Sequence, residues 1–97
     1  MGIEEVLGRY RDEIYRIAGR HGVTRVRVYG RLAEGTAGPD SDVDLLVDAG
    51  ETVTPWFPAG LKGDLEELLG RHVHIAEEDG LTLPAWREYV LAEAVDL

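Results

Sequence analysis

The sequence alternates between helical and strand patterns along its 97 residues, and this alternation restricts the fold more than any other feature. Apolar residues recur at helical spacing in three segments, while short alternating or continuous apolar runs predict three strands. In chain order we expect a helix over 3–21, strands over 24–29 and 42–48, a helix over 59–69, a strand over 73–76 and a helix beginning near Pro84. This order, αβ(α)βαβα, predicts an α+β fold with a small mixed sheet of three or more strands backed by helices, in a single domain over 1–97.

The apolar pattern also predicts which side chains cover the core. Trp56 and Phe57 lie in a long loop that contains two prolines, and we expect both rings to pack over the core. The last helix is expected to direct four residues inward, namely Trp86, Val90, Leu91 and Ala94. So small a sheet is expected to be open on one face, and its exposed edge favours association with a partner or a second copy.

The composition excludes several classes of protein. Ten basic and nineteen acidic residues give a net charge of −9, which argues against general binding to nucleic acid backbones. There is no cysteine, so disulfides and thiolate metal sites are excluded. No apolar run is long enough for a membrane span, and the first residues show no secretory signal, so we expect a cytoplasmic protein without membrane contact.

The charge is divided unevenly between two parts of the chain. Residues 1–31 hold seven arginines and four acidic residues, whereas residues 32–97 hold three basic and fifteen acidic residues. The respective charges are +3 and −12. Two solvated faces of opposite sign would explain this division, and so would acidic residues that converge on a cation.

Two aspartates mark the start of the second predicted strand. Asp42 and Asp44 are two positions apart, so both carboxylates leave the same face of the strand. Neighbouring carboxylates repel each other, and a hard cation such as Mg²⁺ relieves that repulsion. Asp40 and Asp48 add negative charge nearby. A solvated strand end would explain the Asp-x-Asp pattern alone.

A possible phosphate-binding turn precedes these aspartates. Gly30 ends the first strand, and Arg31 stands eleven residues before Asp42. Glycine permits a sharp turn and a close approach to a ligand, and a helical turn over 31–34 would offer free N–H groups to an anion. A phosphate turn beside metal-binding carboxylates predicts a nucleotide site.

This segment resembles the signature of the minimal nucleotidyltransferase family within the DNA polymerase β-like superfamily. The family shows Gly-Ser, about ten residues, and then Asp-x-Asp. Further matching positions are Gly35, Pro39, Asp40, Ser41, the run Leu45-Leu46-Val47, the segment LEELLGRHVHI and the C-terminal EYVLAEAVDL. The resemblance implies transfer of a nucleoside monophosphate from ATP or another nucleoside triphosphate, with Asp42 and Asp44 as catalytic Mg²⁺ ligands and Gly30 and Arg31 at the phosphates. It also implies a partner, since many members are similar to antitoxins that inactivate a helical HEPN-domain toxin, in some cases by adenylylation.

The sequence departs from the family pattern at two positions. Arg31 replaces the serine of Gly-Ser, and it could either bind phosphate or occupy the place of the metal. His74 falls where a third carboxylate is expected, on the side of Asp42 and Asp44. His72 shares that face, so a His/Asp transition-metal site and two ordinary exposed histidines are both open. Two functions therefore remain: an active transferase, or an impaired acidic module that neutralises its partner by direct association.

Overall fold

One four-stranded mixed sheet organises the molecule. The computed structural model describes residues 1–97, and the strands are β1 (Val23–Tyr29), β2 (Val43–Ala49), β3 (Val73–Glu77) and β4 (Val95–Asp96). Their order across the sheet is β3-β2-β1-β4. Strand β1 pairs antiparallel with both β2 and β4, whereas β2 and β3 are parallel. The predicted α+β fold with a mixed sheet is confirmed.

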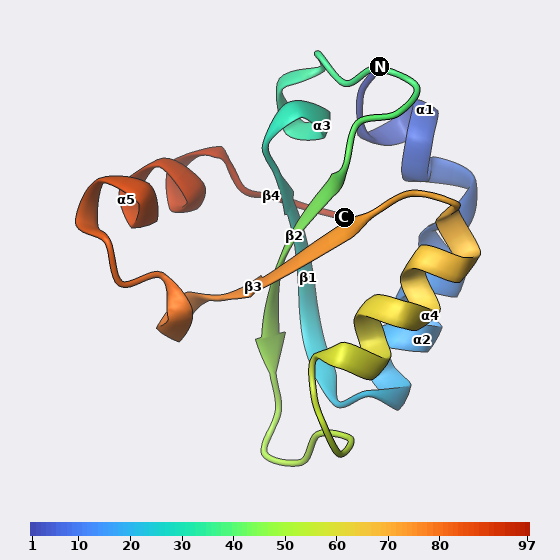
Figure 1. Ribbon diagram of the computed structural model, residues 1–97, viewed down its shortest axis with the longest axis vertical. Helices are drawn as coiled ribbons and strands as arrows, with labels where there is room; N and C mark the ends of the chain where they lie inside the picture. Colours follow the sequence, from blue (N-terminus) through green and yellow to red (C-terminus); the bar gives the residue numbers. More distant parts are fainter.

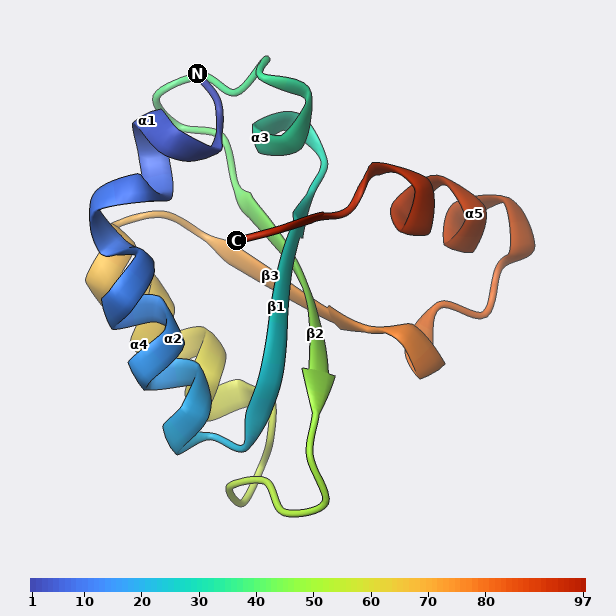
Figure 2. The same ribbon diagram turned by 180° about the vertical axis from the view of Figure 1, so that it is seen from behind.

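The helices lie on both sides of this sheet. They are α1 (Ile3–Leu7), η1 (Gly8–Tyr10), α2 (Arg11–Arg20), α3 (Arg31–Glu34), α4 (Ala59–Leu69), η2 (Glu78–Gly80) and α5 (Pro84–Glu93), where η denotes a 3₁₀ helix. Helices α2 and α4 lie side by side against one face, and α5 stands on the opposite side (Figures 1 and 2). None of the helices combines the length and apolar character needed to cross a lipid bilayer.

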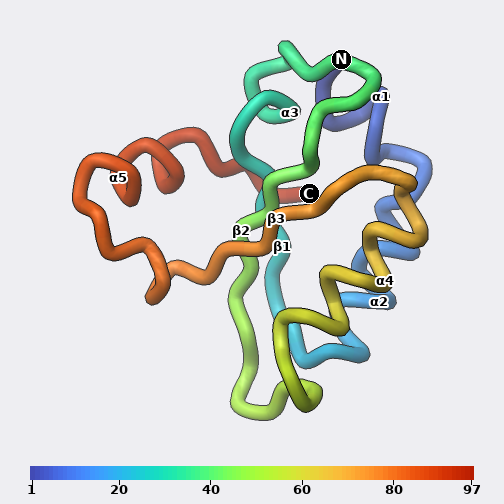
Figure 3. Tube along the Cα trace, in the orientation of Figure 1, coloured from blue at the N-terminus to red at the C-terminus, as the bar shows by residue number.

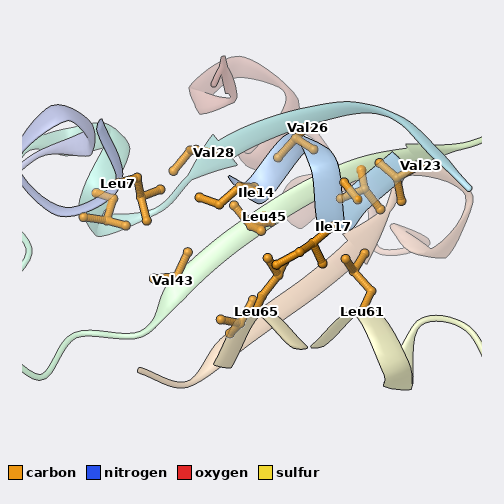
Figure 4. Close-up of a cluster of buried hydrophobic side chains, with 14 of the residues drawn as sticks. Leu7, Ile14, Ile17, Val23, Val26, Val28, Val43, Leu45, Leu61 and Leu65 are labelled. Carbon is orange, nitrogen blue, oxygen red and sulfur yellow. The ribbon is translucent and has the colours of Figure 1, made fainter. Parts of the chain in front are cut away.

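The main core lies between the sheet and helices α1, α2 and α4. Strands β1 and β2 direct every second residue towards it, and these valines and leucines meet apolar side chains of the helices (Figure 4). The buried residues labelled in that view are Leu7, Ile14, Ile17, Val23, Val26, Val28, Val43, Leu45, Leu61 and Leu65. A smaller cluster on the other face contains Tyr29, Leu46, Leu81 and Val90. This second face is only partly covered, as expected for so small a sheet.

Two expectations about the ends of the chain differ from the structure. The helix predicted over 3–21 is divided by η1, which begins at Gly8, a residue with low helix propensity. The final helix ends at Glu93, and the residues after it form β4 against β1. A strand of two residues has no periodicity that the sequence could reveal.

Two tryptophans expected in the core are exposed. The exposed fraction of Trp56 is 89%, and only its neighbour Phe57 packs against the core. Trp86 is 46% exposed, although Val90 on the same helix is fully buried. The loop that carries Trp56 lies at the opposite end of the molecule from α3 (Figure 3). The two indole rings therefore belong to different surfaces.

Candidate functional site

The two predicted aspartates lie together at the start of β2, on the face away from α2 and α4. Asp42 directly precedes the strand, and Asp44 is its second residue. In the sheet register Asp44 stands between Tyr29 of β1 and His74 of β3. Three neighbouring strands therefore bring these side chains to one level of the sheet.

Gly30 lies directly beneath Asp44. Gly30 directly precedes α3, and its backbone has φ +75° and ψ −148°. Residues with a side chain rarely adopt this conformation. A Cβ atom added at Gly30 would lie 2.5 Å from Oδ2 of Asp44. The sequence predicts a close approach of Gly30 to a ligand, whereas in the structure the backbone of Gly30 lies close to Asp44. The missing side chain of Gly30 leaves room for the Asp44 carboxylate in its present position.

Arg31 begins α3 and is exposed at the rim of the site. None of the hydrogen bonds or salt bridges of the structure involves its guanidinium, so it is not paired with either aspartate. A free guanidinium beside two carboxylates can bind a phosphate group through two parallel hydrogen bonds. The Arg31 guanidinium therefore does not stand between the two carboxylates in the place of a metal.

His74 contacts Asp42, as its predicted orientation required. The distance from Nε2 of His74 to Oδ2 of Asp42 is 2.8 Å. This hydrogen bond is the main reason why the pKa of Asp42 lies below its usual value. His72 instead lies 3.5 Å from Oε2 of Glu66, and it lines a different hollow. The two histidines therefore do not converge on one site.

Asp44 has the opposite electrostatic environment. Burial raises its pKa, the charge of Asp42 raises it further, and His74 offsets part of the effect. The ionised form of Asp44 is thus costly in the absence of a counter-charge. A cation between the two carboxylates would remove this cost, which is the physical condition for a metal site.

A polar hollow of about 340 Å³ opens above these residues. None of its lining residues is hydrophobic, and they are Arg31, Asp40, Ser41, Asp42, Asp44 and His74. Asp40 thus contributes to the site as expected. Asp48 does not, because its Oδ1 accepts a hydrogen bond from Arg27 at 3.3 Å further along the sheet.

The loop that leads into Asp42 is held by a residue that the sequence pattern did not single out. Nη1 of Arg71 donates hydrogen bonds of 3.0 Å to the carbonyls of Gly38 and Ser41. The hydroxyl of Ser41 accepts a 2.8 Å hydrogen bond from the Gly38 N–H. Arg71 therefore positions the carboxylates from the turn before β3. No local pattern distinguishes it from an ordinary surface arginine.

The donor set fits Mg²⁺ better than a transition metal. No cluster of three or more histidine, cysteine or acidic side chains forms a site that could hold a metal ion. Asp42 and Asp44 supply oxygen ligands only, and Mg²⁺ is commonly held by one or two carboxylates together with phosphate oxygens and water. Two carboxylates alone do not complete the octahedral coordination that Mg²⁺ requires.

Comparison with known families agrees with this geometry. Residues 8–97 match the nucleotidyltransferase domain family. The chain belongs to this family. The match includes the Gly30–Arg31 turn and every residue of the polar hollow. The resemblance noted from the Asp-x-Asp segment is therefore confirmed over nearly the whole chain.

Two relatives are similar over most of the sequence. A Methanocaldococcus jannaschii protein, provisionally named a protein adenylyltransferase, is 33% identical over 97 residues, covering 100% of this chain and 99% of the relative. The protein adenylyltransferase MntA of Thermococcus cleftensis is 35% identical over 79 residues, covering 81% of this chain and 77% of the relative.

Solved structures share the fold. A protein provisionally identified as a minimal nucleotidyltransferase has 46% identity and a TM-score of 0.80, covering 100% of this chain and 97% of that one. A toxin–antitoxin complex with AMP-PNP has a TM-score of 0.71 and 17% identity, covering 88% of this chain and 69% of that one. The second likeness concerns the fold alone.

Proposed function

We propose that this chain is a metal-dependent nucleotidyltransferase that transfers AMP from ATP to a hydroxyl group of a partner protein. The partner would be a small helical HEPN-domain toxin, and this chain its antitoxin. The observation that carries the proposal is the pair Asp42 and Asp44 on one sheet face above Gly30. The names of the two relatives, both protein adenylyltransferases, support the same reaction.

The residues of the polar hollow divide the work of binding ATP. Asp42 and Asp44 would hold Mg²⁺, and the guanidinium of Arg31 would bind a phosphate oxygen at the rim. Bound Mg²⁺ supplies positive charge that neutralises the triphosphate and orients it for in-line displacement. Gly30 leaves space for the Asp44 carboxylate, since a side chain at this position would displace it.

The reaction exchanges one phosphorus–oxygen bond for another. The acceptor hydroxyl oxygen forms a bond to the α-phosphorus, and the bond from that phosphorus to the β-phosphate oxygen breaks. Pyrophosphate leaves, and the hydroxyl proton passes to solvent. Because such a transition state is stabilised mainly by positioning and charge, the site can act without a dedicated general base.

One contact favours a second candidate function, an acidic module that neutralises its partner by direct association. His74 already occupies Oδ2 of Asp42, where the family pattern has a carboxylate. An imidazole reduces the negative charge available to Mg²⁺. In this alternative the fold and the acidic surface remain, and catalysis is lost.

Titration of the protein with Mg²⁺ and ATP, followed by NMR, separates the two functions. For the transferase we expect the amide signals of Gly30, Asp42 and Asp44 to shift, and the Asp42→Asn/Asp44→Asn variant to abolish the shifts. With ATP labelled at the α-phosphate, label should pass to the HEPN-domain toxin proposed as the partner. Unmoved amides at saturating Mg²⁺ and ATP would rule out the transferase.

The double change Arg31→Ser and His74→Asp tests whether the site is merely weakened. It restores the residue types of the family pattern, so we expect tighter Mg²⁺ binding in the same titration. No gain in affinity would indicate that the geometry of the carboxylates, and not only their charge, differs from that of an active site.

A further inference from the structure

A second, partly apolar hollow lies between the edge strand β3 and the start of α5. Its volume is about 440 Å³, and four of its seven lining residues are hydrophobic. These residues come from β3, η2 and the start of α5, and they are Ile75, Ala76, Glu77, Asp79, Gly80, Leu81 and Trp86. None of the residues that line the polar hollow lines this second one.

The strand register places this hollow one step along the sheet from the carboxylates. Asp44 and His74 are paired at one level, and Leu46 and Ala76 are paired two residues further on. Two residues of a strand span roughly 6.6 Å. Ala76, which lines the apolar hollow, is therefore next to His74, which lines the polar one. The two hollows are thus lined by neighbouring residues of the same strand.

Trp86 forms a fixed but accessible wall of this surface. Its ring stacks on Tyr89 with a centroid distance of 5.3 Å and meets the edge of Tyr29 at 6.2 Å. The hydroxyl of Tyr89 donates a 2.8 Å hydrogen bond to Glu34 of α3, so the aromatic pair is anchored beside the phosphate turn. Trp86 nevertheless remains 46% exposed. A ring held in place and open to solvent is suited to stack on a flat ligand.

We propose that this hollow binds the adenine base of the nucleotide, stacked against Trp86, while the triphosphate lies at Asp42 and Asp44. The inference rests on the proposed function and deepens it by locating the base. Proximity favours a nucleotide over a separate ligand, because Trp86 contacts Tyr29, and Tyr29 pairs with Asp44 in the sheet. The carboxylates of Glu77 and Asp79 line the hollow, and they can accept hydrogen bonds from the exocyclic amino group of adenine.

The acidic lining also bears on the identity of the base. Inosine carries a carbonyl oxygen where adenosine carries the amino group. That oxygen accepts and cannot donate, so it would face Glu77 or Asp79 without a hydrogen bond. We therefore expect ITP to bind more weakly than ATP. Equal affinity for the two nucleotides would overturn the assignment of adenine.

Isothermal titration of the folded chain, with Mg²⁺ present, tests the stacking directly. The variant Trp86→Ala should weaken ATP binding about 10-fold, the size of effect typical for loss of one base–aromatic stack. Its affinity for inorganic tripolyphosphate should be unchanged, which also shows that the variant is folded. Trp86→Phe should recover part of the lost ATP affinity.

Trp56→Ala is the matched control, because Trp56 is 89% exposed and belongs to the loop at the opposite end of the molecule from α3 (Figure 3). It should leave binding of both probes unchanged. If Trp86→Ala binds ATP as the parent chain does, the inference is wrong, and the exposed face of Trp86 is assigned to a protein partner or a second copy. If the parent chain binds neither ATP nor tripolyphosphate, the proposed function fails, and the inference fails with it.

Discussion

Replacement of Gly30 by alanine should disturb both stability and nucleotide binding through a single contact. The added Cβ would lie 2.5 Å from Oδ2 and 3.3 Å from Cγ of Asp44. Real Cβ atoms do not approach other heavy atoms so closely, so the carboxylate or the turn has to move. Both belong to the candidate site, and the change therefore tests whether Gly30 sets the position of Asp44.

The size of the effect follows from two costs. The backbone at Gly30 has φ +75° and ψ −148°, and holding a non-glycine residue in so sparsely populated a region costs about 1–3 kcal/mol. Turning Asp44 away from its preferred rotamer costs about 0.5–1.5 kcal/mol more. We expect the Gly30→Ala variant to lose about 1.5–4.5 kcal/mol of the free energy of unfolding, the sum of the two costs.

Urea unfolding followed by circular dichroism measures this loss, and Gly35→Ala is its matched control. Gly35 also has positive φ, +81°, but a Cβ there would meet nothing within 4 Å. The control should lose about 1–2 kcal/mol, the cost of the left-handed backbone alone. Only Gly30→Ala should also weaken the binding of Mg²⁺ and ATP, because only that change displaces Asp44.

Two results would refute the reasoning. Equal losses of stability in the two variants would mean that the contact with Asp44 carries no cost. Unchanged affinity for ATP in Gly30→Ala would mean that nucleotide binding does not depend on the position of Asp44 that Gly30 permits. Either result would leave Gly30 as an ordinary glycine of a tight turn.

Four further changes test the electrostatics and the packing around the site. At neutral pH, Asp44→Asn should raise the free energy of unfolding, because the pKa of Asp44 is raised and its charged form is unfavourable. Asp42→Asn should lower the free energy of unfolding, because it removes a carboxylate that His74 stabilises, and thermal unfolding of both variants measures the two signs. The pKa of Glu66 is lowered mainly because its carboxylate accepts a hydrogen bond from a backbone N–H of β3. The ionised carboxylate therefore stabilises the fold at neutral pH, and this stabilisation is lost as the pH falls below about 4. Glu66→Gln should reduce the acid dependence of the free energy of unfolding, measured with urea between pH 7 and pH 3. Leu61 is fully buried, and Leu61→Ala should cost about 2–5 kcal/mol in the same assay.

The sequence predicts those parts of the fold that depend on local periodicity. The helix over 59–69 has the same bounds as α4, because its leucines repeat at helical spacing and Gly70 ends it in the left-handed conformation. The ends of β1, β2 and β3 agree with the predicted ends within one or two residues, because these strands also have a local apolar pattern. Strand β4 and the break at Gly8 could not be predicted, since the first depends on pairing with a distant strand and the second interrupts an unbroken apolar pattern.

The site could be predicted to a similar extent. Alternation along a strand suffices to place Asp42 and Asp44 on one face, and the parallel pairing of β2 with β3 brings His74 to them. The contact between Gly30 and Asp44 depends on the register of β1 against β2, which the sequence does not reveal. The hydrogen bonds of Arg71 depend on the path of the loop before Asp42, so they could not be predicted from the sequence either.

The two aspartates have opposite pKa shifts, and each shift follows from the surroundings of its carboxylate. The hydrogen bond with His74 already stabilises the charge of Asp42, so we expect a cation to gain less at that carboxylate. The Asp44 carboxylate accepts no such hydrogen bond, and burial is the main cause of its raised pKa. We therefore expect a cation held by both carboxylates to gain more electrostatic stabilisation at Asp44 than at Asp42. Since the aromatic pair Trp86–Tyr89 lies beside the same residue through Tyr29, the carboxylate that most needs a counter-charge also lies closest to the proposed base site.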